Sequence, residues 1–394
     1  AVSDPELALD LLLHDAYERA QQRRLLARLS PAVRVLHAPS PLARKPLQAA
    51  FCIDVRSEVF RRALEQVCPV AETIGFAGFF GFPIEYVPIG HTHGKAQCPV
   101  LLKPTHTVCE SVADASDDEE QEILGLRLLR RRAMRAWKSF KSSAISSFTY
   151  VETMGLLFAG KIVGDSLGYT RTVADPNTDG LDARVIRRMR PRIEPRVVGD
   201  RETGFDPARR LAMAETMLRA MSLTDGFARL VMLTGHGATT VNNPHAAALD
   251  CGACGGNHGL TSARVLAQMA NRPGVRRRLR EKGIDIPGDT CFVPALHDTT
   301  TDEIHLADID LLPSSHLLYI DRLREGLVAA ARLCAAERVA TLVETPVPLM
   351  PQTAARLARR NALDWSQVRP EWGLSGNVWF LIGRRDATSA MSFD

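Results

Sequence analysis

Two apolar runs in this sequence constrain its fold most, because polar residues follow each of them directly. Residues 47–51 precede Cys52, and residues 227–234 precede His236. Runs of this length predict buried β-strands, and strands that alternate with helical patterns are typical of a mostly parallel sheet flanked by helices. Ligands of such sheets bind at the carboxyl ends of the strands. We therefore expect an α/β fold with a site where these two strands end.

The first junction groups three side chains of different chemistry. If residues 47–54 form one strand, the alternation of side chains places Cys52, Asp54 and, where the strand ends, Arg56 on one side. A thiolate, a carboxylate and a guanidinium in one small space are costly to bury, and a metal ion is a common reason to tolerate them. Ser57 then fits as the cap of the following helix.

The second junction offers further residue types that bind metals. His236 lies between two glycines, and a glycine-rich segment with Cys251 and Cys254 follows. Zinc accepts thiolate, imidazole and carboxylate ligands in four-coordinate sites, and the two junctions together supply all three. A lone histidine is more often a hydrogen-bonded structural residue, and a Cys-x-x-Cys pair also suits redox chemistry. The coincidence of the two junctions makes a metal site our hypothesis, and residue types alone leave open which cysteine binds.

Three further segments carry weaker signals. Residues 73–83 interleave glycines with phenylalanines, which is typical of a tightly packed buried turn or, alternatively, of an apolar wall beside a site for a small nonpolar molecule. The helix predicted at 116–141 begins acidic and continues basic, as a solvated face does; a docking surface for an acidic partner or membrane headgroups is the alternative. The polar cluster at 297–302 reads as a capped turn, or else as support for a metal-bound histidine.

The remaining patterns complete the expected order of elements. We expect further helices at 1–30 (ended by Pro31), 207–221, 261–269, 275–282 and 315–343, and further strands at 84–89, 98–103, 290–296 and 378–382. The chain then divides into a helical segment with linker (1–46), a first half of the α/β core (47–110), a helical or irregular insertion (111–206), a second half of the core (207–345) and a C-terminal segment (346–394). Because the first residue is not Met and a helical pattern is already under way, we expect a piece of a longer protein.

Composition excludes several classes of protein. With 45% hydrophobic and 24% charged residues, the 394-residue chain is neither disordered nor fibrous, and its net charge of +4 is weak for a nucleic-acid binder. No apolar run reaches the roughly 18 residues that span a bilayer, and the start of the chain shows no signal peptide. The eight cysteines are scattered, which fits a reducing compartment and leaves thiolates available to a metal.

The order Cys52-x-Asp54-x-Arg56, followed far downstream by a histidine and a cysteine, resembles the β-class carbonic anhydrases. Those enzymes hold zinc with two cysteines and a histidine and pair the aspartate with the arginine; in their inactive form the aspartate takes the fourth zinc position. Longer sequence segments at 51–62, 75–81, 235–244 and 249–256 are more specific. They resemble the DabA family, the soluble zinc subunits of bacterial inorganic-carbon accumulation complexes. This likeness runs from about residue 47 to about residue 380.

The resemblance implies a β-carbonic-anhydrase-like core with helical insertions and four zinc ligands, which are Cys52, Asp54, His236 and Cys251. It also implies that Arg56 draws Asp54 off the metal. In the β-class enzymes the histidine and the second cysteine lie close together, whereas fourteen residues separate them here. The choice of Cys251 over Cys254 therefore rests on the likeness to DabA alone.

The function implied by the resemblance is zinc-dependent conversion of carbon dioxide to bicarbonate, gated by Asp54 and Arg56, coupled to transport and inactive in the isolated subunit. The implied partner is a multi-pass membrane subunit, DabB, and the implied location is peripheral, on the cytoplasmic face of the bacterial inner membrane. A structural zinc site in a scaffold of a membrane complex is the alternative, because four protein ligands leave no open position. A dithiol oxidoreductase that uses Cys251 and Cys254 is a second one.

Overall fold

The computed structural model of this chain describes residues 4–35, 44–166, 178–241, 243–343, 349–369, 379–383, 385, 388 and 391. Residues 45–376 form one compact unit, and residues 1–44 with 377–394 form another.

The smaller unit contains α1 (Pro5–Val35), a helix of 31 residues. The predicted N-terminal helix is thus confirmed, but the expected end at Pro31 is wrong, since the helix continues to Val35. Proline removes one N–H from a helix and tends to kink it, but it does not always end a long helix. The strand expected at 378–382 is also wrong for the part that is described, because residues 379–382 have no strand structure; Val378 lies outside the described residues.

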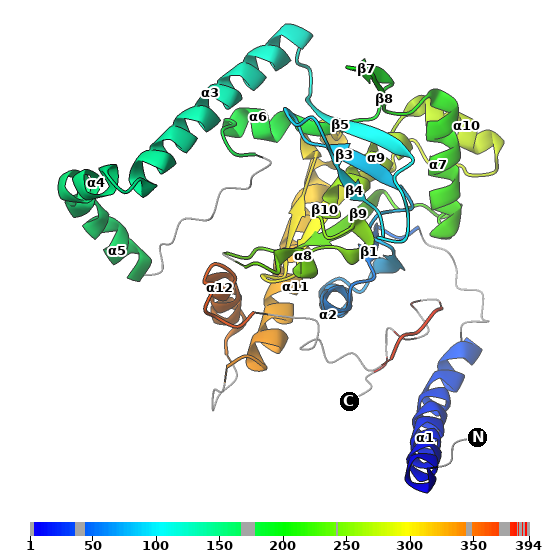
Figure 1. Cartoon of the computed structure of the whole chain (residues 1–394). Helices are drawn as coiled ribbons and strands as arrows, with labels where there is room; N and C mark the ends of the chain where they lie inside the picture. The colour runs from blue at the N-terminus through cyan, green and yellow to red at the C-terminus, as the bar shows by residue number, and fades with distance from the viewer. Residues whose placement is uncertain are drawn as a thin grey trace. The chain divides into compact units, whose positions relative to one another are not determined.

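A five-stranded sheet in the order β11–β10–β9–β1–β2 forms the centre of the larger unit (Figure 1). Its strands are β1 (Leu47–Cys52), β2 (Ala71–Phe76), β9 (Leu230–Gly237), β10 (Cys291–Asp298) and β11 (Glu303–Leu306). β1 pairs in parallel with β2 and β9, β9 pairs in parallel with β10, and β11 is antiparallel at the edge. The expected mostly parallel central sheet is confirmed.

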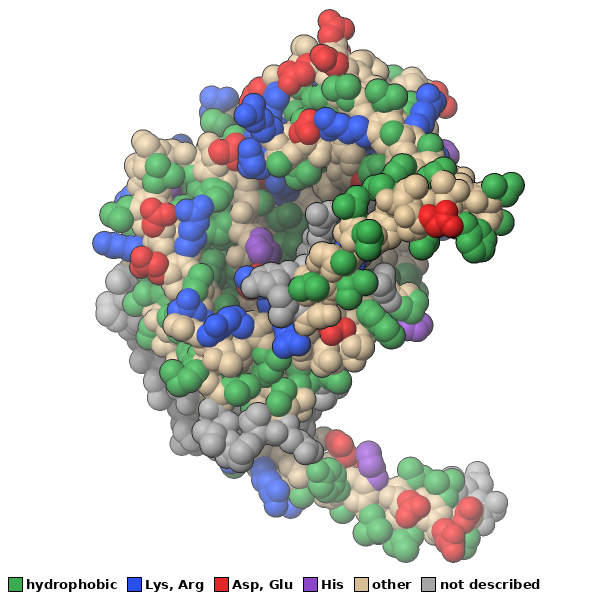
Figure 2. Space-filling model, turned by 90° about the vertical axis from the view of Figure 1, so that its left-hand side faces the viewer, with side chains coloured by type: hydrophobic (Ala, Val, Ile, Leu, Met, Phe, Trp, Pro, Cys, Tyr) green, Lys and Arg blue, Asp and Glu red, His purple; other side chains and the backbone are tan. Residues whose placement is uncertain are grey.

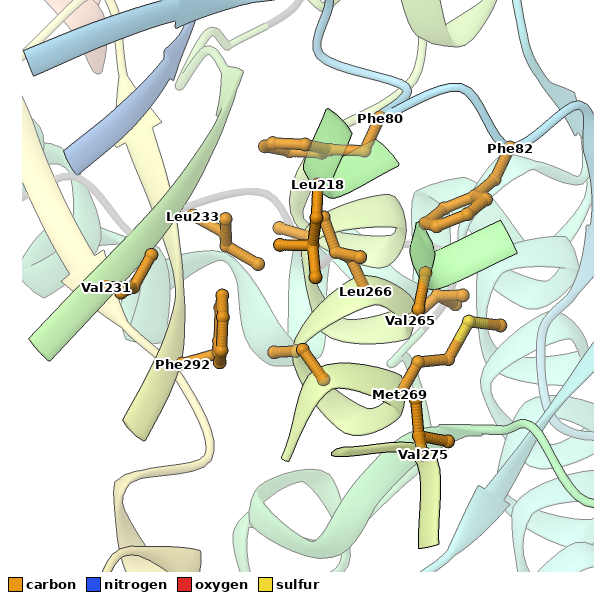
Figure 3. Close-up of a cluster of buried hydrophobic side chains, with 14 of the residues drawn as sticks. Phe80, Phe82, Leu218, Val231, Leu233, Val265, Leu266, Met269, Val275 and Phe292 are labelled. Carbon is orange, nitrogen blue, oxygen red and sulfur yellow. The ribbon is translucent and has the colours of Figure 1, made fainter. Parts of the chain in front are cut away.

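Helices cover both faces of this sheet, because successive side chains of its strands point to opposite sides. On one face Ala49, Phe51 and Met232 belong to a buried cluster with α2 (Val55–Val67) and α11 (Leu317–Ala340). The cluster on the other face is shown in Figure 3 and joins side chains of β9 and β10 to α7 (Pro207–Ala220), α9 (Leu260–Ala270) and α10 (Pro273–Glu281). Each large apolar side chain buried in these layers stabilises the fold by about 1.5–3 kcal/mol before entropy is counted.

A second, smaller sheet has the order β4–β3–β5–β6 and is accompanied by the hairpin β7–β8. These strands are β3 (Ile84–Val87), β4 (Lys95–Gln97), β5 (His106–Val112), β6 (Met189–Arg192), β7 (Arg196–Val198) and β8 (Arg201–Thr203). The strand expected at 84–89 is confirmed, whereas the strand expected at 98–103 is wrong. That segment is a turn in which Val100 and Leu101 are 90% and 92% exposed. Pro99 has no backbone N–H to donate to a neighbouring strand, and β4, which pairs with β3, ends at Gln97.

The chain between β5 and β6 is largely helical. It forms α3 (Asp117–Ser142), α4 (Ser146–Met154), the 3-10 turn η1 (Gly155–Leu157), α5 (Phe158–Ser166) and α6 (Ala183–Arg188). The helix predicted at 116–141 is confirmed as α3, and the hydroxyl of Ser116 caps it by accepting a hydrogen bond from the backbone N–H of Glu119 at 3.1 Å. Among the described helices of the chain, none is both long and apolar enough to cross a bilayer.

The remaining short elements lie after β9 and around α11. They are α8 (Ala246–Leu249), η2 (Gly252–Cys254), η3 (Ile309–Leu311), η4 (Ser314–His316) and α12 (Pro351–Ala362). α12 packs against the second half of α11 through a small apolar cluster of its own. The segment with α8 and η2 matters most for function, because it follows the carboxyl end of a central strand.

Candidate metal centre

The fold brings together three of the residues that the sequence singles out. Cys52 is the last residue of β1, and His236 lies one residue before the end of the neighbouring strand β9. Cys251 stands between α8 and η2. A ligand atom from each of these three buried residues lies within 4.8 Å of the other two. The carboxyl edge of the parallel sheet thus holds a Cys-His-Cys cluster that could bind a metal ion.

The spacing of the two sulfur atoms suits zinc. The Sγ atoms of Cys52 and Cys251 are 3.9 Å apart. A tetrahedral zinc ion with Zn–S bonds of about 2.3 Å places two sulfur ligands about 3.8 Å apart. Because these cysteines come from segments far apart in the sequence, no local turn imposes this distance.

His236 gives a second sign that the donor set fits a metal. Its side chain is 2% exposed, and by ordinary distance and angle neither ring nitrogen has a hydrogen-bond partner in the described part of the structure. A buried polar nitrogen without a partner is costly, and such groups call for an explanation. Coordination to a metal would satisfy one of the two nitrogens.

The two thiols of the cluster keep their protons unless a positive charge is close to them. Hydrogen bonding with Cys251, followed by burial, raises the pKa of Cys52 well above its usual value. Hydrogen bonding with Cys254 and burial raise the pKa of Cys251, although its contact with Cys52 acts the other way. Two adjacent buried sulfurs do not both ionise by themselves, and a bound metal ion would provide the positive charge that makes them thiolates.

Cys254 plays a different part in the loop. Its side chain is buried, but its sulfur does not belong to the cluster of ligand atoms. Its backbone N–H donates to the carbonyl of Cys251 at 2.9 Å, and this bond tightens the turn that presents Cys251. The geometry therefore distinguishes two cysteines that spacing alone leaves equivalent.

Asp54 stands beside the cluster, and its local structure corrects two expectations. The strand ends at Cys52 and not at Asp54, and the helix α2 begins at Val55. Asp54 caps this helix, since its Oδ1 accepts the backbone N–H of Arg56 at 2.9 Å; Ser57, the expected cap, lies inside the first turn. The grouping predicted from strand alternation arises instead from a helix N-terminus, where a short acceptor satisfies a free N–H.

The guanidinium of Arg56 holds both oxygens of Asp54. Its Nε donates to Oδ1 at 2.8 Å and its Nη2 donates to Oδ2 at 3.1 Å. Burial acts to raise the pKa of Asp54, but the hydrogen bonds from Arg56 and the positive charge outweigh burial, so that the pKa is lowered. The ionised Oδ2 lies 3.4 Å from Nε2 of His236. Asp54 is thus near enough to join the cluster but is held by Arg56.

Arg56 also connects the two halves of the site. Its side chain is fully buried, and Nη2 donates to the carbonyl oxygen of Leu249 at 2.8 Å. Leu249 ends α8, two residues before Cys251. A single side chain therefore fixes the capping aspartate on one junction and the cysteine loop on the other.

Gly78 is a residue of this site that the sequence analysis did not single out. A Cβ atom at this position would lie 2.7 Å from Sγ of both Cys52 and Cys251. The glycine and phenylalanine segment thus covers the two sulfurs, and Phe79 packs against them. The buried turn predicted there is confirmed by Phe80, which is fully buried. The only signal in the sequence was the run of glycines itself.

The polar segment after β10 forms a buried network next to the site. Asp298 accepts from the backbone N–H groups of Thr300 at 3.1 Å and Thr239 at 3.2 Å, in agreement with the capped turn that we preferred. The ring Nδ1 of His297 lies 3.1 Å from the hydroxyl of Ser57, the neighbour of Arg56 in the chain. This network therefore also supports the first turn of α2.

The expected family is shown by comparison with known proteins. The family described as "Probable inorganic carbon transporter subunit DabA" matches residues 3–394. Curated relatives with this name include DabA 2 of Bradyrhizobium sp. (strain BTAi1), 60% identical over 387 residues, and DabA 1 of Bradyrhizobium sp. (strain ORS 278), 61% identical over 387 residues. The DabA of Chloroflexus aurantiacus (strain J-10-fl) is 51% identical over 389 residues.

Each of these matches covers 98% of this chain and 45% of the relative, so the chain spans a little under half of the length of these relatives. No solved structure matches, and the likeness of the core to carbonic anhydrases stays a prediction. The match along nearly the whole chain, together with identities of 51–61%, shows that the chain belongs to the DabA family of inorganic carbon transporter subunits.

Proposed function

We propose that this chain carries zinc-dependent chemistry for an inorganic-carbon uptake complex, namely the conversion of carbon dioxide to bicarbonate. The names of the relatives speak only of probable inorganic carbon transporter subunits. The observation that carries the proposal is the arrangement of the site, in which three buried metal-binding residues cluster and the fourth candidate, Asp54, is paired with Arg56. Catalytic zinc sites commonly have three protein ligands and one open position.

Three residues of the chain, Cys52, His236 and Cys251, would hold the zinc ion. When bound, zinc supplies hydroxide at neutral pH, because it lowers the pKa of a coordinated water from about 16 to about 7. The apolar turn with Gly78 and Phe79 covers the sulfurs and excludes water from that side. Such a wall suits carbon dioxide, which is small and nonpolar.

Asp54 and Arg56 would act as a gate. While Arg56 holds the carboxylate, Asp54 leaves the fourth position to substrate; released from Arg56, it can close that position. The distance of 3.4 Å between its Oδ2 and Nε2 of His236 suits this exchange. A nitrogen and an oxygen ligand of one tetrahedral zinc ion also lie about 3.4 Å apart.

We further infer a multi-pass membrane partner, DabB, and a location at the cytoplasmic face of the inner membrane. The support is the name of the relatives, which describes them as subunits of a transporter. A gate that depends on a partner explains why we expect little hydration activity from the isolated chain. Coupling to an ion gradient would then act on the pairing of Asp54 with Arg56.

A structural zinc site in a scaffold protein is the second candidate, and the depth of burial favours it. Cys251 is fully buried and Cys52 is 4% exposed, as is usual in closed structural sites. Such a site has no need of an aspartate that Arg56 holds beside the ligands, however; only the bond from Arg56 to the carbonyl of Leu249 would serve it. The dithiol alternative loses support because Cys251 and Cys254 are both fully buried and the pKa of Cys251 is raised, whereas redox-active cysteines are accessible and have a lowered pKa.

Metal content and X-ray absorption of the purified chain test the ligand set. We expect one zinc ion with two sulfur ligands, one nitrogen and one oxygen in the wild type, and a protein that keeps its zinc in the Asp54→Ala and Cys254→Ser variants. A protein that purifies without zinc when zinc is supplied, or a shell with three sulfur ligands, would overturn the assignment.

Bicarbonate accumulation in cells that depend on the complete complex tests the gate. We expect the substitution Arg56→Ala, introduced in the full-length protein, to keep zinc and expression but to abolish accumulation. The matched control is Arg62→Ala on the same helix, since Arg62 pairs with Glu337 on the surface. Accumulation that persists in Arg56→Ala would leave the scaffold function as the better explanation.

A further inference from the structure

The helices that follow the first turns of α3 expose an unusual amount of apolar surface. Between residues 128 and 166, here called the helical arm, none of the side chains that the structure describes is buried. Six apolar side chains of α4, η1 and α5 are more than half exposed, namely Phe148, Val151, Leu156, Leu157, Ile162 and Val163. Exposed apolar patches of this kind on a folded protein mark interaction surfaces.

The arm is nevertheless a built structure with its own packing. The ring of Tyr150 on α4 lies 5.7 Å from Trp137 on α3 and 5.9 Å from Phe158 on α5, between ring centroids. The ammonium group of Lys141 lies 5.2 Å from the centroid of Tyr150. These edge-on ring contacts and the cation over the ring hold the three helices together. The three helices are therefore folded together, and their other apolar side chains face outward.

The base of the arm is anchored to the segment that leads into α6. Arg127 is buried and donates through Nε to the carbonyl of Asp179 at 3.1 Å. Arg130 forms an ion pair with Asp182, also at 3.1 Å. Because the base is fixed, the part beyond it presents its side chains as one surface.

The charge of the arm is strongly positive. It contains seven Lys and Arg residues against Glu152 and Asp165, a net charge of +5, whereas the whole chain has +4 and the rest of it therefore −1. Six of the seven basic residues lie on α3. The most exposed apolar side chains lie after α3 and include Leu156 at 90%, Ile145 at 88% and Phe148 at 75%. Figure 2 views the molecule from the side on which these helices lie in Figure 1, and hydrophobic side chains are widely exposed there beside Lys and Arg.

We propose that the helical arm docks directly on a bilayer that contains anionic phospholipids. The basic side chains of α3 would meet the headgroups, and the apolar side chains of α4, η1 and α5 would enter the region of the acyl chains. Trp137 and Tyr150 lie between these two parts of the arm, as aromatic side chains do at membrane interfaces. α4 and α5 have nine residues each, which is too short to span a bilayer and suits helices that lie in its surface.

The pattern of exposure favours lipid over a groove in a partner protein. Leu156 and Leu157 are neighbours in the sequence and point to different sides of the chain, yet they are 90% and 70% exposed. Ile162 and Val163 repeat this pattern on α5. A groove in a protein receives one stripe of side chains at positions i, i+3, i+4 and i+7. Acyl chains have no fixed shape, so they also accept apolar side chains from adjacent faces of a short helix.

Flotation of the purified chain with lipid vesicles tests this proposal, which rests on the membrane location in the proposed function but not on its zinc chemistry. We expect binding to vesicles of phosphatidylglycerol and phosphatidylethanolamine, much weaker binding to phosphatidylcholine alone, and a decline with salt as charges are screened. The double substitution Leu156→Ser with Leu157→Ser should weaken binding at least about tenfold, because it removes apolar area from the inserted part. Its matched control, Val100→Ser with Leu101→Ser, alters a similarly exposed apolar pair on a turn outside the arm and should leave binding unchanged.

A reversal of charge provides a second, independent test. Arg132→Glu with Arg135→Glu should also weaken binding about tenfold or more, since each basic side chain contributes to attraction by an anionic surface. Arg277→Glu with Arg278→Glu, on exposed positions of α10, is the matched control. Circular dichroism checks that each variant is folded. A wild-type chain that purifies without zinc but still floats would leave the arm proposal standing while the proposed chemistry fails.

Three results would overturn the proposal. They are failure of the wild-type chain to bind anionic vesicles, equal binding to neutral vesicles, and equal losses in the arm variants and their controls. Binding only to vesicles that carry a membrane protein of the complex would assign the arm to a protein partner and would likewise overturn direct docking on lipid.

Discussion

Gly78 offers a direct test of the metal centre, because one added methyl group would stand where two proposed ligands meet. In Gly78→Ala, the new Cβ would lie 2.7 Å from Sγ of Cys52 and 2.7 Å from Sγ of Cys251. Non-bonded carbon atoms rest about 3.5–4.0 Å apart, and by this measure the sulfurs or the turn must move by about 1 Å. Such a movement separates the two ligands or pushes both away from the position between them.

A displacement of about 1 Å is large for a zinc site, where ligand distances hold to within about 0.2 Å. Substitutions that only disturb the groups around the ligands weaken metal binding about 10–100-fold. Displacement of two ligands should therefore weaken zinc binding by at least about 100-fold. The added methyl group itself costs about 1–3 kcal/mol of folding free energy, so the variant should still fold.

Competition with a chromophoric zinc chelator measures this change in affinity. The control is Gly252→Ala, which follows Cys251 directly but whose Cβ would have no heavy atom within 4 Å. We expect wild-type affinity for the control and the large loss for Gly78→Ala, with the fold of both checked by circular dichroism. An unchanged affinity of Gly78→Ala, or equal losses in the two variants, would refute a metal held between these sulfurs.

Further predictions concern the cysteine loop, a buried ion pair and a buried glutamate. Cys251→Ser should lose zinc while Cys254→Ser keeps it, by elemental analysis; the reverse result would exchange their roles. Asp302→Ala should lower the free energy of unfolding by about 3–5 kcal/mol, because it leaves the buried Arg338, which donates to Asp302 at 2.5 Å, without its counter-charge. Urea unfolding measures this, and a loss below 1 kcal/mol would contradict it. Burial raises the pKa of Glu110 above its usual 4.5, so its contribution to stability is complete below pH 4.5 and declines as the pH rises through the pKa of the folded state. The stability of Glu110→Gln relative to the wild type should therefore improve from pH 4.5 to pH 7.5, and a constant difference would contradict this sign.

The central sheet could be predicted from the sequence because strands covered on both faces read as continuous apolar runs. Residues 47–51 and 227–234 indeed contribute to β1 and β9. An apolar run alone does not reveal whether it is buried, and the misassigned segment 98–103 shows this: Val100 and Leu101 are apolar but exposed at a turn. The pattern of apolar residues along the chain does not reveal whether another helix or strand packs over them.

The site could be predicted in its residue types but not in its local geometry. Alternation along a strand grouped Cys52, Asp54 and Arg56, yet the structure groups them through a helix cap, which depends on one side-chain hydrogen bond. The role of Gly78 could not be predicted, because it depends on sulfur atoms from two other segments of the chain. Likewise, the hydrogen bond from Arg56 to the carbonyl of Leu249 depends on how distant segments pack, which a single sequence does not state.

The separation between the two cysteines of the cluster has a consequence for biosynthesis. Cys52 and Cys251 are 199 positions apart, so a ribosome that adds about 5–20 residues per second needs about 10–40 s to pass from one to the other. During this time the thiol of Cys52 has no partner sulfur, and the nascent chain cannot assemble the Cys-His-Cys cluster. Contacts this distant also form late in folding. Metal capture would then mark a chain in which both halves of the site have been synthesised and brought together.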